Sequence, residues 1–199
     1  MIEFNNLCTS EPYLLFADCY KKALESNQKI IEAISISSFD KIQNEVDSRF
    51  VNLKYINKDE WIFFSNYNSP KANQFKSHDQ ITAVFYWSSI NVQIRMKAFI
   101  KKTDKDFSDK HFKGRNHSKN ALAISSNQSE PIQSYKKVIQ IYEKIKSQDS
   151  NLYSRPDYWG GFSFTPYCIE FWEGHNSRLN KRTLFTLEKS KWIKVFLQP

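Results

Sequence analysis

The chain has 199 residues, of which 40% are hydrophobic and 16% aromatic, a composition typical of one folded domain with a full core rather than of a disordered chain. Its formal net charge of +8 favours anionic partners, but the Lys and Arg residues are spread along the whole sequence, which argues against a nucleic-acid module. The three cysteines form no Cys-x-x-Cys pair, which predicts a protein without disulfides and without a zinc site. The sequence shows no basic leader and no run of 18 apolar residues, so we expect a cytoplasmic protein without a membrane span.

The first half of the chain predicts one helix followed by strands. Ser10, Glu11 and Pro12 are typical of a helix start, and the helix is expected over about residues 11–26. Beyond it the spacing of apolar residues changes to two, which predicts strands joined by hairpin-type links. The predicted strands cover residues 33–37, 48–56, 61–67, 81–90 and 91–102.

Two features of this half suggest binding. A short helix is predicted from Ser69 and Pro70, and its free backbone N–H groups, with Lys71 in the first turn, suit a phosphate. In the strand over 91–102, apolar residues alternate with polar ones from Val92 to Ala98. One of its faces is therefore packed, and the other, which carries Gln93, meets solvent, a ligand or another subunit.

The second half predicts a helical insertion over about residues 104–149, including a helix from Pro131 to Ile145. Strands then return over residues 162–172, 182–188 and 191–197. Strands, a helical insertion and further strands predict a mainly β domain with helices, built as an antiparallel barrel. A barrel of this size is filled by its own side chains. A large ligand would therefore lie outside it, against helices or against a second copy related by a two-fold axis.

Most catalytic and metal-binding motifs are missing. The four histidines are scattered, so no metal site is expected, and there is no Gly-x-Ser-x-Gly, Gly-x-Gly-x-x-Gly or Walker pattern. What recurs is a basic or amide side chain beside an aromatic one, as in EFWEGHNSRLNKR at 170–182. Arginine binds oxyanions with a rigid fork of donors and tryptophan offers a ring face, so this stretch suits a planar anionic ligand, with a solvated basic turn as the alternative.

Seven short motifs along the chain combine these residue types. They are SRFVNLK (48–54), FFSNYNSPKA (63–72), YWSSINVQIR (86–95), SDKHFKGR (108–115), SSNQS (125–129), RPDYWGGF (155–162) and EFWEGHNSRLNKR (170–182). Their order resembles that of pyridoxamine 5'-phosphate oxidases from about Ile34 to Pro199, and the final WIKVFLQP is similar to that family's C-terminus. The resemblance implies one FMN-binding split β-barrel domain over residues 1–199, which forms a homodimer with FMN at the subunit interface.

The resemblance also implies which side chains contact FMN. Arg49, Lys71 and the turn at 128–129 would oppose its phosphate, while Gln93 and Trp172 would contact its ring. Arg49 and Lys54 reach the same side of their strand only if a bulge or bend intervenes. The implied cofactor-binding residues are Arg49, Phe50, Val51, Lys54, Phe64, Ser65, Lys71, Gln93, Gln128, Ser129, Trp172 and Arg182.

A second set of side chains would face a small phosphorylated substrate. The implied substrate-binding residues are Lys54, His111, Arg115, Lys119, Arg178 and Asn180. Arg178 and Asn180 would take the catalytic positions, with Arg178 stabilising negative charge near the ring. The implied reaction oxidises pyridoxamine or pyridoxine 5'-phosphate to pyridoxal 5'-phosphate, with molecular oxygen as acceptor and the cofactor carrying the difficult step.

Four positions depart from the family pattern. Pro70 stands where the family usually has Arg, His111 replaces a Tyr, Lys119 replaces a Ser and Asn180 replaces a His. Asparagine cannot carry a proton near neutral pH as histidine can. Three of the four lie on the substrate side, so three alternatives stay open: a related FMN oxidase with another substrate, like those of phenazine biosynthesis, a non-catalytic FMN-binding protein, and a basic nucleic-acid module.

Overall fold

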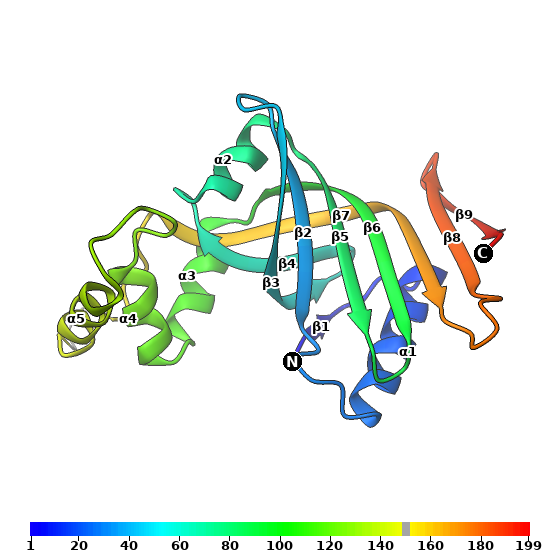
Figure 1. Ribbon diagram of the computed structural model, residues 1–199, viewed down its shortest axis with the longest axis horizontal. Coiled ribbons are helices and arrows are strands. Elements are labelled where there is room, and N and C mark those ends of the chain that lie inside the picture. The colour runs from blue at the N-terminus through cyan, green and yellow to red at the C-terminus, as the bar shows by residue number, and fades with distance from the viewer. Residues whose placement is uncertain (149–151) are drawn as a thin grey trace.

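The computed structural model describes residues 1–148 and 152–199, and within them the chain forms strands and helices in one mainly β arrangement (Figure 1). The strands are β1 (Glu3–Asn5), β2 (Ala33–Asp40), β3 (Glu45–Asn57), β4 (Glu60–Asn66), β5 (Gln80–Trp87), β6 (Val92–Lys102), β7 (Trp159–Glu173), β8 (Lys181–Glu188) and β9 (Lys191–Leu197). The helices are α1 (Glu11–Glu25), α2 (Pro70–Ser77), α3 (Lys105–Lys113), α4 (His117–Ser125) and α5 (Tyr135–Lys146).

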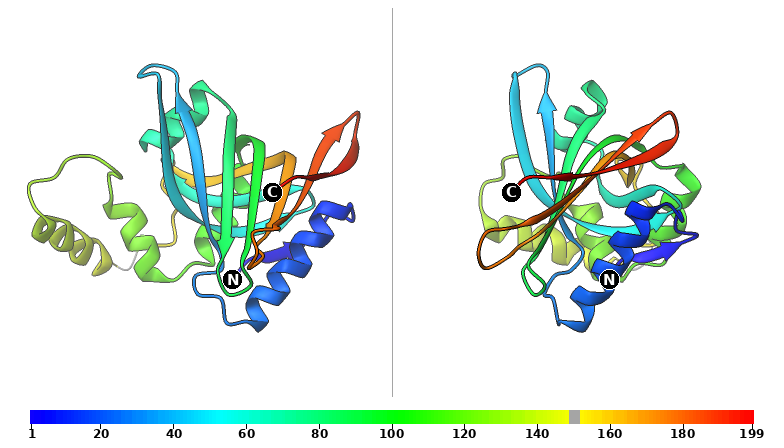
Figure 2. Two further views of the ribbon diagram at one scale, coloured as in Figure 1. Left: turned by 45° about the vertical axis from the view of Figure 1, so that its right-hand side comes forward. Right: turned by 90° about the vertical axis from the view of Figure 1, so that its right-hand side faces the viewer.

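Hydrogen bonds join the strands into one sheet in the order β1-β3-β2-β5-β6-β7-β8-β9, and β4 pairs with both β3 and β7. Because β4 links β3 to β7, the strands β2 to β7 form a closed ring of pairings. The hairpin β8–β9 extends beyond this ring on the side away from α3, α4 and α5 (Figures 1 and 2). The sheet therefore presents two separate regions, one beside the helices and one along β6, β7 and β8.

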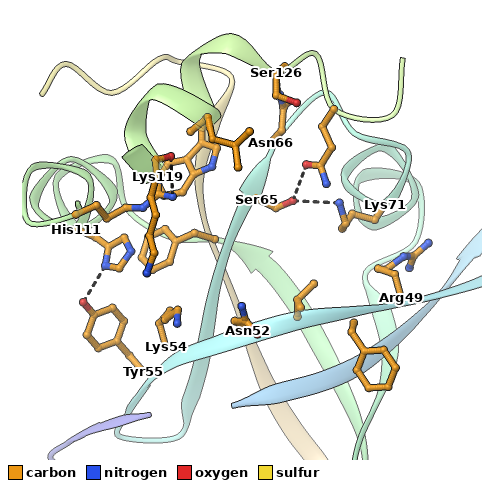
Figure 3. Close-up of a pocket in the computed structure, with 18 of the residues that line it drawn as sticks. Arg49, Asn52, Lys54, Tyr55, Ser65, Asn66, Lys71, His111, Lys119 and Ser126 are labelled. Atoms are coloured by element: carbon orange, nitrogen blue, oxygen red, sulfur yellow. Dashed lines mark hydrogen bonds between the residues drawn. The ribbon is translucent and has the colours of Figure 1, made fainter. Parts of the chain in front are cut away.

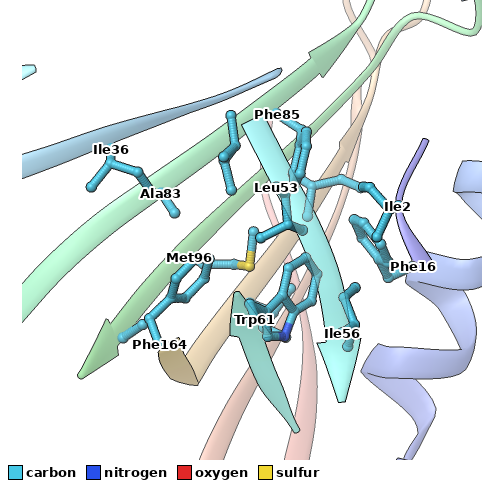
Figure 4. Packing of buried hydrophobic residues seen from close by; sticks show 14 of the residues in the cluster. Ile2, Phe16, Ile36, Leu53, Ile56, Trp61, Ala83, Phe85, Met96 and Phe164 are labelled. Carbon is cyan, nitrogen blue, oxygen red and sulfur yellow. The ribbon is translucent and has the colours of Figure 1, made fainter. Parts of the chain in front are cut away.

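Aromatic side chains fill the centre of the ring (Figure 4). The rings of Phe16 from α1 and Trp61 from β4 meet edge to face with their centroids 4.4 Å apart, and both side chains are fully buried. Phe85 of β5 packs against both. Such close-packed burial supplies most of the stabilisation of a domain of this size, so the ring is a rigid scaffold for the side chains on its outer faces.

The predicted strands are confirmed, four of them with longer ends, but the strand predicted over 81–90 already ends at Trp87, and two other elements differ. The helix predicted from Pro131 begins at Tyr135, because the side chain of Ser134 caps it by accepting a hydrogen bond from the backbone N–H of Lys137 at 3.2 Å. Strand β1 was not predicted, since three residues are too few to show a period. Residue 149, the last of the predicted insertion, lies outside the described residues.

A β-bulge interrupts the pairing of β3 with β4. Leu53 pairs with Phe63 and Tyr55 with Ile62, so the register shifts by one residue at Lys54. Leu53 and Ile56 are fully buried, whereas Lys54 and Tyr55 between them are half-buried, so the bulge turns Tyr55 out of the core. Arg49 and Lys54 both line the same cavity.

No helix among the described residues is long and apolar enough to cross a membrane.

Candidate functional site

A cavity of about 1230 Å³ lies between strands β3 and β4 and helices α2, α3 and α4 (Figure 3). It is large enough for a cofactor together with a small substrate, since sites for single drug-sized ligands range from about 300 to 1000 Å³. Basic and hydroxyl or amide side chains gather at two places in it, and aromatic rings, among them Phe64 and Trp159, also line it.

The first basic end is built around Lys71, in the first turn of α2. Its side chain is buried, and its ammonium donates to the hydroxyls of Ser65 at 3.1 Å and Ser69 at 3.2 Å. Ser65 in turn donates to Gln128 Oε1 at 3.4 Å. Burial, and then the charge of Arg49, lowers the pKa of Lys71 to about 8. An anion arriving at this end would favour the charged form of Lys71, so this end suits a phosphate.

The second basic end is built around Arg115, which follows α3. Its guanidinium lies 4.3 Å from the centre of the Trp159 ring, and its Nη2 donates to the backbone carbonyl of Lys119 at 3.2 Å. Its buried Nη1 has no hydrogen-bond partner among the described residues, and burial lowers the pKa of Arg115 to about 10. An unpaired buried donor costs free energy until a ligand accepts its hydrogen bond, so this end also suits an anion. Lys54 and Lys119 line the same end.

His111 of α3 contributes a neutral group between these cations. Its ring stacks on Phe64 with the centroids 3.6 Å apart, and its Nδ1 shares a hydrogen bond of 2.8 Å with the hydroxyl of Tyr55. Burial, and then the charges of Arg115, Lys54 and Lys119, lowers the pKa of His111 to about 4. At neutral pH this side chain therefore offers hydrogen bonds but no charge.

A separate row of polar side chains crosses β6, β7 and β8. Gln93 pairs with Trp172, and Trp172 pairs with Arg182, so the three side chains lie side by side on one face of the sheet. Glu170, which is buried on the same face, accepts from Arg182 Nε at 2.8 Å and pairs with Arg95. Burial alone would raise the pKa of Glu170, but the two arginines lower it. The carboxylate holds Arg182 in place beside Trp172.

The loop between β7 and β8 carries the two residues predicted to be catalytic. Arg178 has a left-handed backbone with φ of 60°, a conformation that costs free energy in residues other than glycine and is often found at functional sites. Asn180 Oδ1 accepts a hydrogen bond of 3.0 Å from the backbone N–H of His175. In this structure Asn180 thus orders the loop that presents Arg178.

The cavity brings together most of the residues that the sequence singled out, and the rest lie elsewhere. Those lining it are Arg49, Phe50, Val51, Lys54, Phe64, Ser65, Lys71, His111, Arg115, Lys119, Gln128 and Ser129. Those that do not line it are Gln93, Trp172, Arg178, Asn180 and Arg182. The resemblance implied one site at the interface of two subunits, and within one chain the two groups lie apart.

Sequence reasoning missed several residues of the cavity. Asp47 stands two residues before Arg49, on the same face of β3, so the period of the strand could have pointed to it. Trp159 lies inside the RPDYWGGF motif. Tyr55 gave no signal, because its contact with His111 depends on the bulge and on how α3 packs over β3.

Comparison with known proteins identifies the family. The family model described as the pyridoxine 5'-phosphate oxidase C-terminal dimerisation region matches residues 159–199. A pyridoxine/pyridoxamine 5'-phosphate oxidase of Haemophilus influenzae is 31% identical over 192 residues, covering 96% of this chain and 91% of the relative. The chain belongs to the pyridoxine/pyridoxamine 5'-phosphate oxidase family. A relative of the same name from Leptospira interrogans is 29% identical over 96% of this chain and 89% of its own length.

Solved structures show the same fold. The structure of PhzG from Burkholderia lata, in complex with tetrahydrophenazine-1-carboxylic acid, matches with a TM-score of 0.90 at 21% identity over 96% of this chain and 93% of that one. A pyridoxamine 5'-phosphate oxidase-related, FMN-binding protein of Nostoc punctiforme matches with a TM-score of 0.79 at 11% identity, covering 96% of this chain and all of that one. These likenesses define the fold and leave the substrate to be argued from the site.

The position of His111 leads to a pH prediction. The pKa of its side chain is about 4 in the folded protein and returns to the ordinary 6.5 when the chain unfolds. Between these values the unfolded state binds a proton that the folded state does not, so acidification from pH 6.5 to pH 4 lowers the free energy of unfolding. We expect His111→Gln to reduce this acid destabilisation in urea denaturation curves at pH 7 and pH 5.

The matched control is His175→Gln, which removes an exposed histidine from the β7–β8 loop. If His111→Gln and His175→Gln change the difference in unfolding free energy between pH 7 and pH 5 equally, burial of His111 is not its source.

Proposed function

We propose that this protein is an FMN-dependent oxidase that converts pyridoxamine or pyridoxine 5'-phosphate to pyridoxal 5'-phosphate, with oxygen as the electron acceptor. The observation that carries the proposal is a single cavity with two basic ends and aromatic rings in its lining, in a chain of this family. One basic end suits the phosphate of FMN and the other suits the phosphate of the substrate, so the two ring systems would meet between them.

The residues at the first end fit the FMN phosphate. Lys71 is a buried ammonium whose described hydrogen bonds go to two hydroxyls and to no carboxylate, so an anionic partner would relieve the cost of burying its charge. Gln128 and the exposed hydroxyl of Ser129 line the same end. The left-handed backbone of Ser129, with φ of 71°, belongs to the tight turn that presents both.

The residues at the second end fit the substrate. When bound, FMN accepts a hydride from the substrate carbon that bears the amine or alcohol. Arg115 and Lys119 would bind the substrate phosphate, with the unpartnered Nη1 of Arg115 as one donor. Lys54 would approach the same substrate from β3, where it now lies 3.8 Å from Glu32. His111, which is neutral, would add a hydrogen bond without adding charge.

We further propose that the ring of strands is the split β-barrel of this family and that two copies form a homodimer. The five predicted residues outside the cavity would then reach the cavity of the other copy, as a two-fold axis permits. The match of residues 159–199 to a dimerisation region supports this arrangement, because that segment carries Trp172, Arg178 and Arg182. Phe50, at the cavity and 75% exposed, is an apolar surface that a second copy would cover.

A related FMN-dependent oxidase with another substrate is the second candidate. It is favoured by the substrate-side departures from the family pattern: a neutral histidine at 111, an additional cation at Lys119 and an asparagine at 180. A second cation beside Arg115 would accept a carboxylate as readily as a phosphate.

The purified protein should be yellow, or become yellow on addition of FMN, with the absorbance bands of a bound flavin. Under air it should produce hydrogen peroxide and pyridoxal 5'-phosphate from pyridoxamine 5'-phosphate, and far less product from pyridoxamine, because Arg115 and Lys119 lose their anion. Absorbance spectra and a peroxide assay measure both.

Other outcomes separate the alternatives. Bound flavin with no turnover of either phosphorylated substrate would favour another substrate or a non-catalytic flavoprotein, which an oxidase screen with carboxylated rings distinguishes. A protein that stays colourless with excess FMN would refute the proposal, and salt-dependent binding to DNA or RNA would then favour a nucleic-acid module.

Sharing of the site between two copies predicts complementation. Lys71→Met damages the cavity and Arg182→Gln damages the β6–β7–β8 row, so each variant alone should bind little FMN. Random reassembly of an equimolar mixture makes half of the dimers mixed, with one copy of each variant. Each mixed dimer has one site with an intact cavity and an intact row and one site with neither, so about one quarter of the wild-type FMN sites are restored. Flavin absorbance after chain exchange measures this. Without recovery, while the wild-type protein treated in the same way regains its flavin, sites shared between copies are ruled out.

Position 180 gives a graded test of the catalytic prediction. Asn180→His supplies a proton carrier, and its Nδ1 can still accept the hydrogen bond from the backbone of His175. We expect turnover of pyridoxine 5'-phosphate to rise by roughly tenfold or more. Asn176→His, on the same loop, is the control. Equal turnover of the two variants would show that position 180 carries no proton.

A further inference from the structure

We propose that Asp47 competes internally with the cofactor phosphate for Arg49 and thereby limits how tightly the cavity holds FMN. Asp47 lines the first basic end of the cavity, and its carboxylate contacts Arg49 Nη2. This inference rests on the proposed FMN site and assigns a role to a residue that the arguments above leave unused.

The hydrogen bonds of Arg49 show why Asp47 matters. A guanidinium has five N–H donors. Nη1 of Arg49 donates to Ser38 Oγ at 2.6 Å and to the backbone carbonyl of Ile36 at 3.4 Å. Nη2 donates to Gln74 Oε1 at 3.0 Å and to the carboxylate of Asp47. Both terminal nitrogens are therefore fully engaged before any phosphate arrives.

Three of these four acceptors are fixed. Ser38 and Gln74 are 3% and 6% exposed, and they bond each other at 2.6 Å, so neither can turn away without leaving a buried polar group unpaired. The carbonyl of Ile36 belongs to the paired backbone of β2 and β3. A phosphate that binds the terminal nitrogens of Arg49 has to replace the remaining acceptor, which is Asp47.

Asp47 is also the acceptor that can leave. Its side chain is 52% exposed, whereas that of Arg49 is 17% exposed. The strand explains their meeting: residues 47 and 49 point to the same face of β3, and Asp47 pairs with Ser38 across the ladder to β2. A rotation of the Asp47 side chain would free Nη2 and move the carboxylate toward water, without changing the backbone.

The charges at this end work in the same direction. Arg49 and Lys71 bring two positive charges, and Asp47 cancels one of them. Pro70, the neighbour of Lys71, adds none. A phosphate with a charge of about −1.5 to −2 therefore meets a net single positive charge and a neighbouring carboxylate that repels it. Removing the negative charge of Asp47 should strengthen FMN binding.

The test is the Kd of FMN for Asp47→Asn, measured by quenching of flavin fluorescence on titration with flavin-free protein. The amide keeps the size of the side chain and loses the charge. We expect FMN to bind roughly tenfold more tightly than to the wild type, because a like charge beside the phosphate is gone. Riboflavin, which lacks the phosphate, should bind both proteins equally.

Glu45→Gln is the matched control. It removes the same charge from the same face of β3, at a position two residues before Asp47 that does not line the cavity. Its Kd for FMN should equal that of the wild type. Asp47→Ser, which shortens the side chain, should tighten FMN binding like Asp47→Asn.

Several results would overturn the inference. It fails if the wild type binds FMN but neither Asp47 variant binds it more tightly, or if riboflavin gains as much affinity as FMN, or if Glu45→Gln has the same effect. In those cases the proposed FMN site stands. If none of the proteins binds FMN, the proposed function and the inference fall together.

Discussion

The β-bulge at Lys54 is the constraint on which the site depends. A strand without it would alternate strictly, and Tyr55 would then point into the core like Leu53. With the one-residue shift, Tyr55 meets His111 at the cavity, and β3 contributes Arg49 to one end of the cavity and Lys54 to the other. A single strand thus spans both anion-binding ends, and the fully paired ring behind it keeps their separation fixed.

The two ends of the cavity differ from the row on β6, β7 and β8 in how they stabilise charge. In the row, the buried carboxylate of Glu170 lies between Arg95 and Arg182, so positive and negative groups satisfy each other. In the cavity, and within residues 1–148 and 152–199, Lys71 has only hydroxyl partners for its hydrogen bonds and Arg115 has a buried donor without a partner. Such groups lower the stability of the free protein and are satisfied when an anion binds, which is the usual balance at a prepared binding site.

The sequence predicted which residues form the strands and the candidate site better than it predicted how those residues are arranged in space. The alternation predicted for the strand over 91–102 was confirmed, because Val92, Ile94 and Met96 are buried while Gln93 faces outward. A two-residue period of apolar residues indicates a strand with one face packed against a core, so this feature can be predicted from the sequence. Contacts such as Tyr55 with His111, which are 56 residues apart in the chain, depend on the packing of α3 over β3 and leave no local pattern. Nor could motif order reveal that Trp172 and Arg182 lie outside the cavity, since a motif names side chains without giving their positions in space.

The separation of these two groups gives the proposed dimer its physical reason. The cavity has cations that need an anion, but it is wide and open beside the exposed ring of Phe50. The row has an ordered arginine, an aromatic ring and an amide, and none of the three lines the cavity. Each region lacks what the other supplies, and a two-fold axis that joins them closes two equivalent sites at once. A flavin held in this way would be bound through its phosphate by one chain and through its ring by the other, so cofactor binding and assembly would stabilise each other.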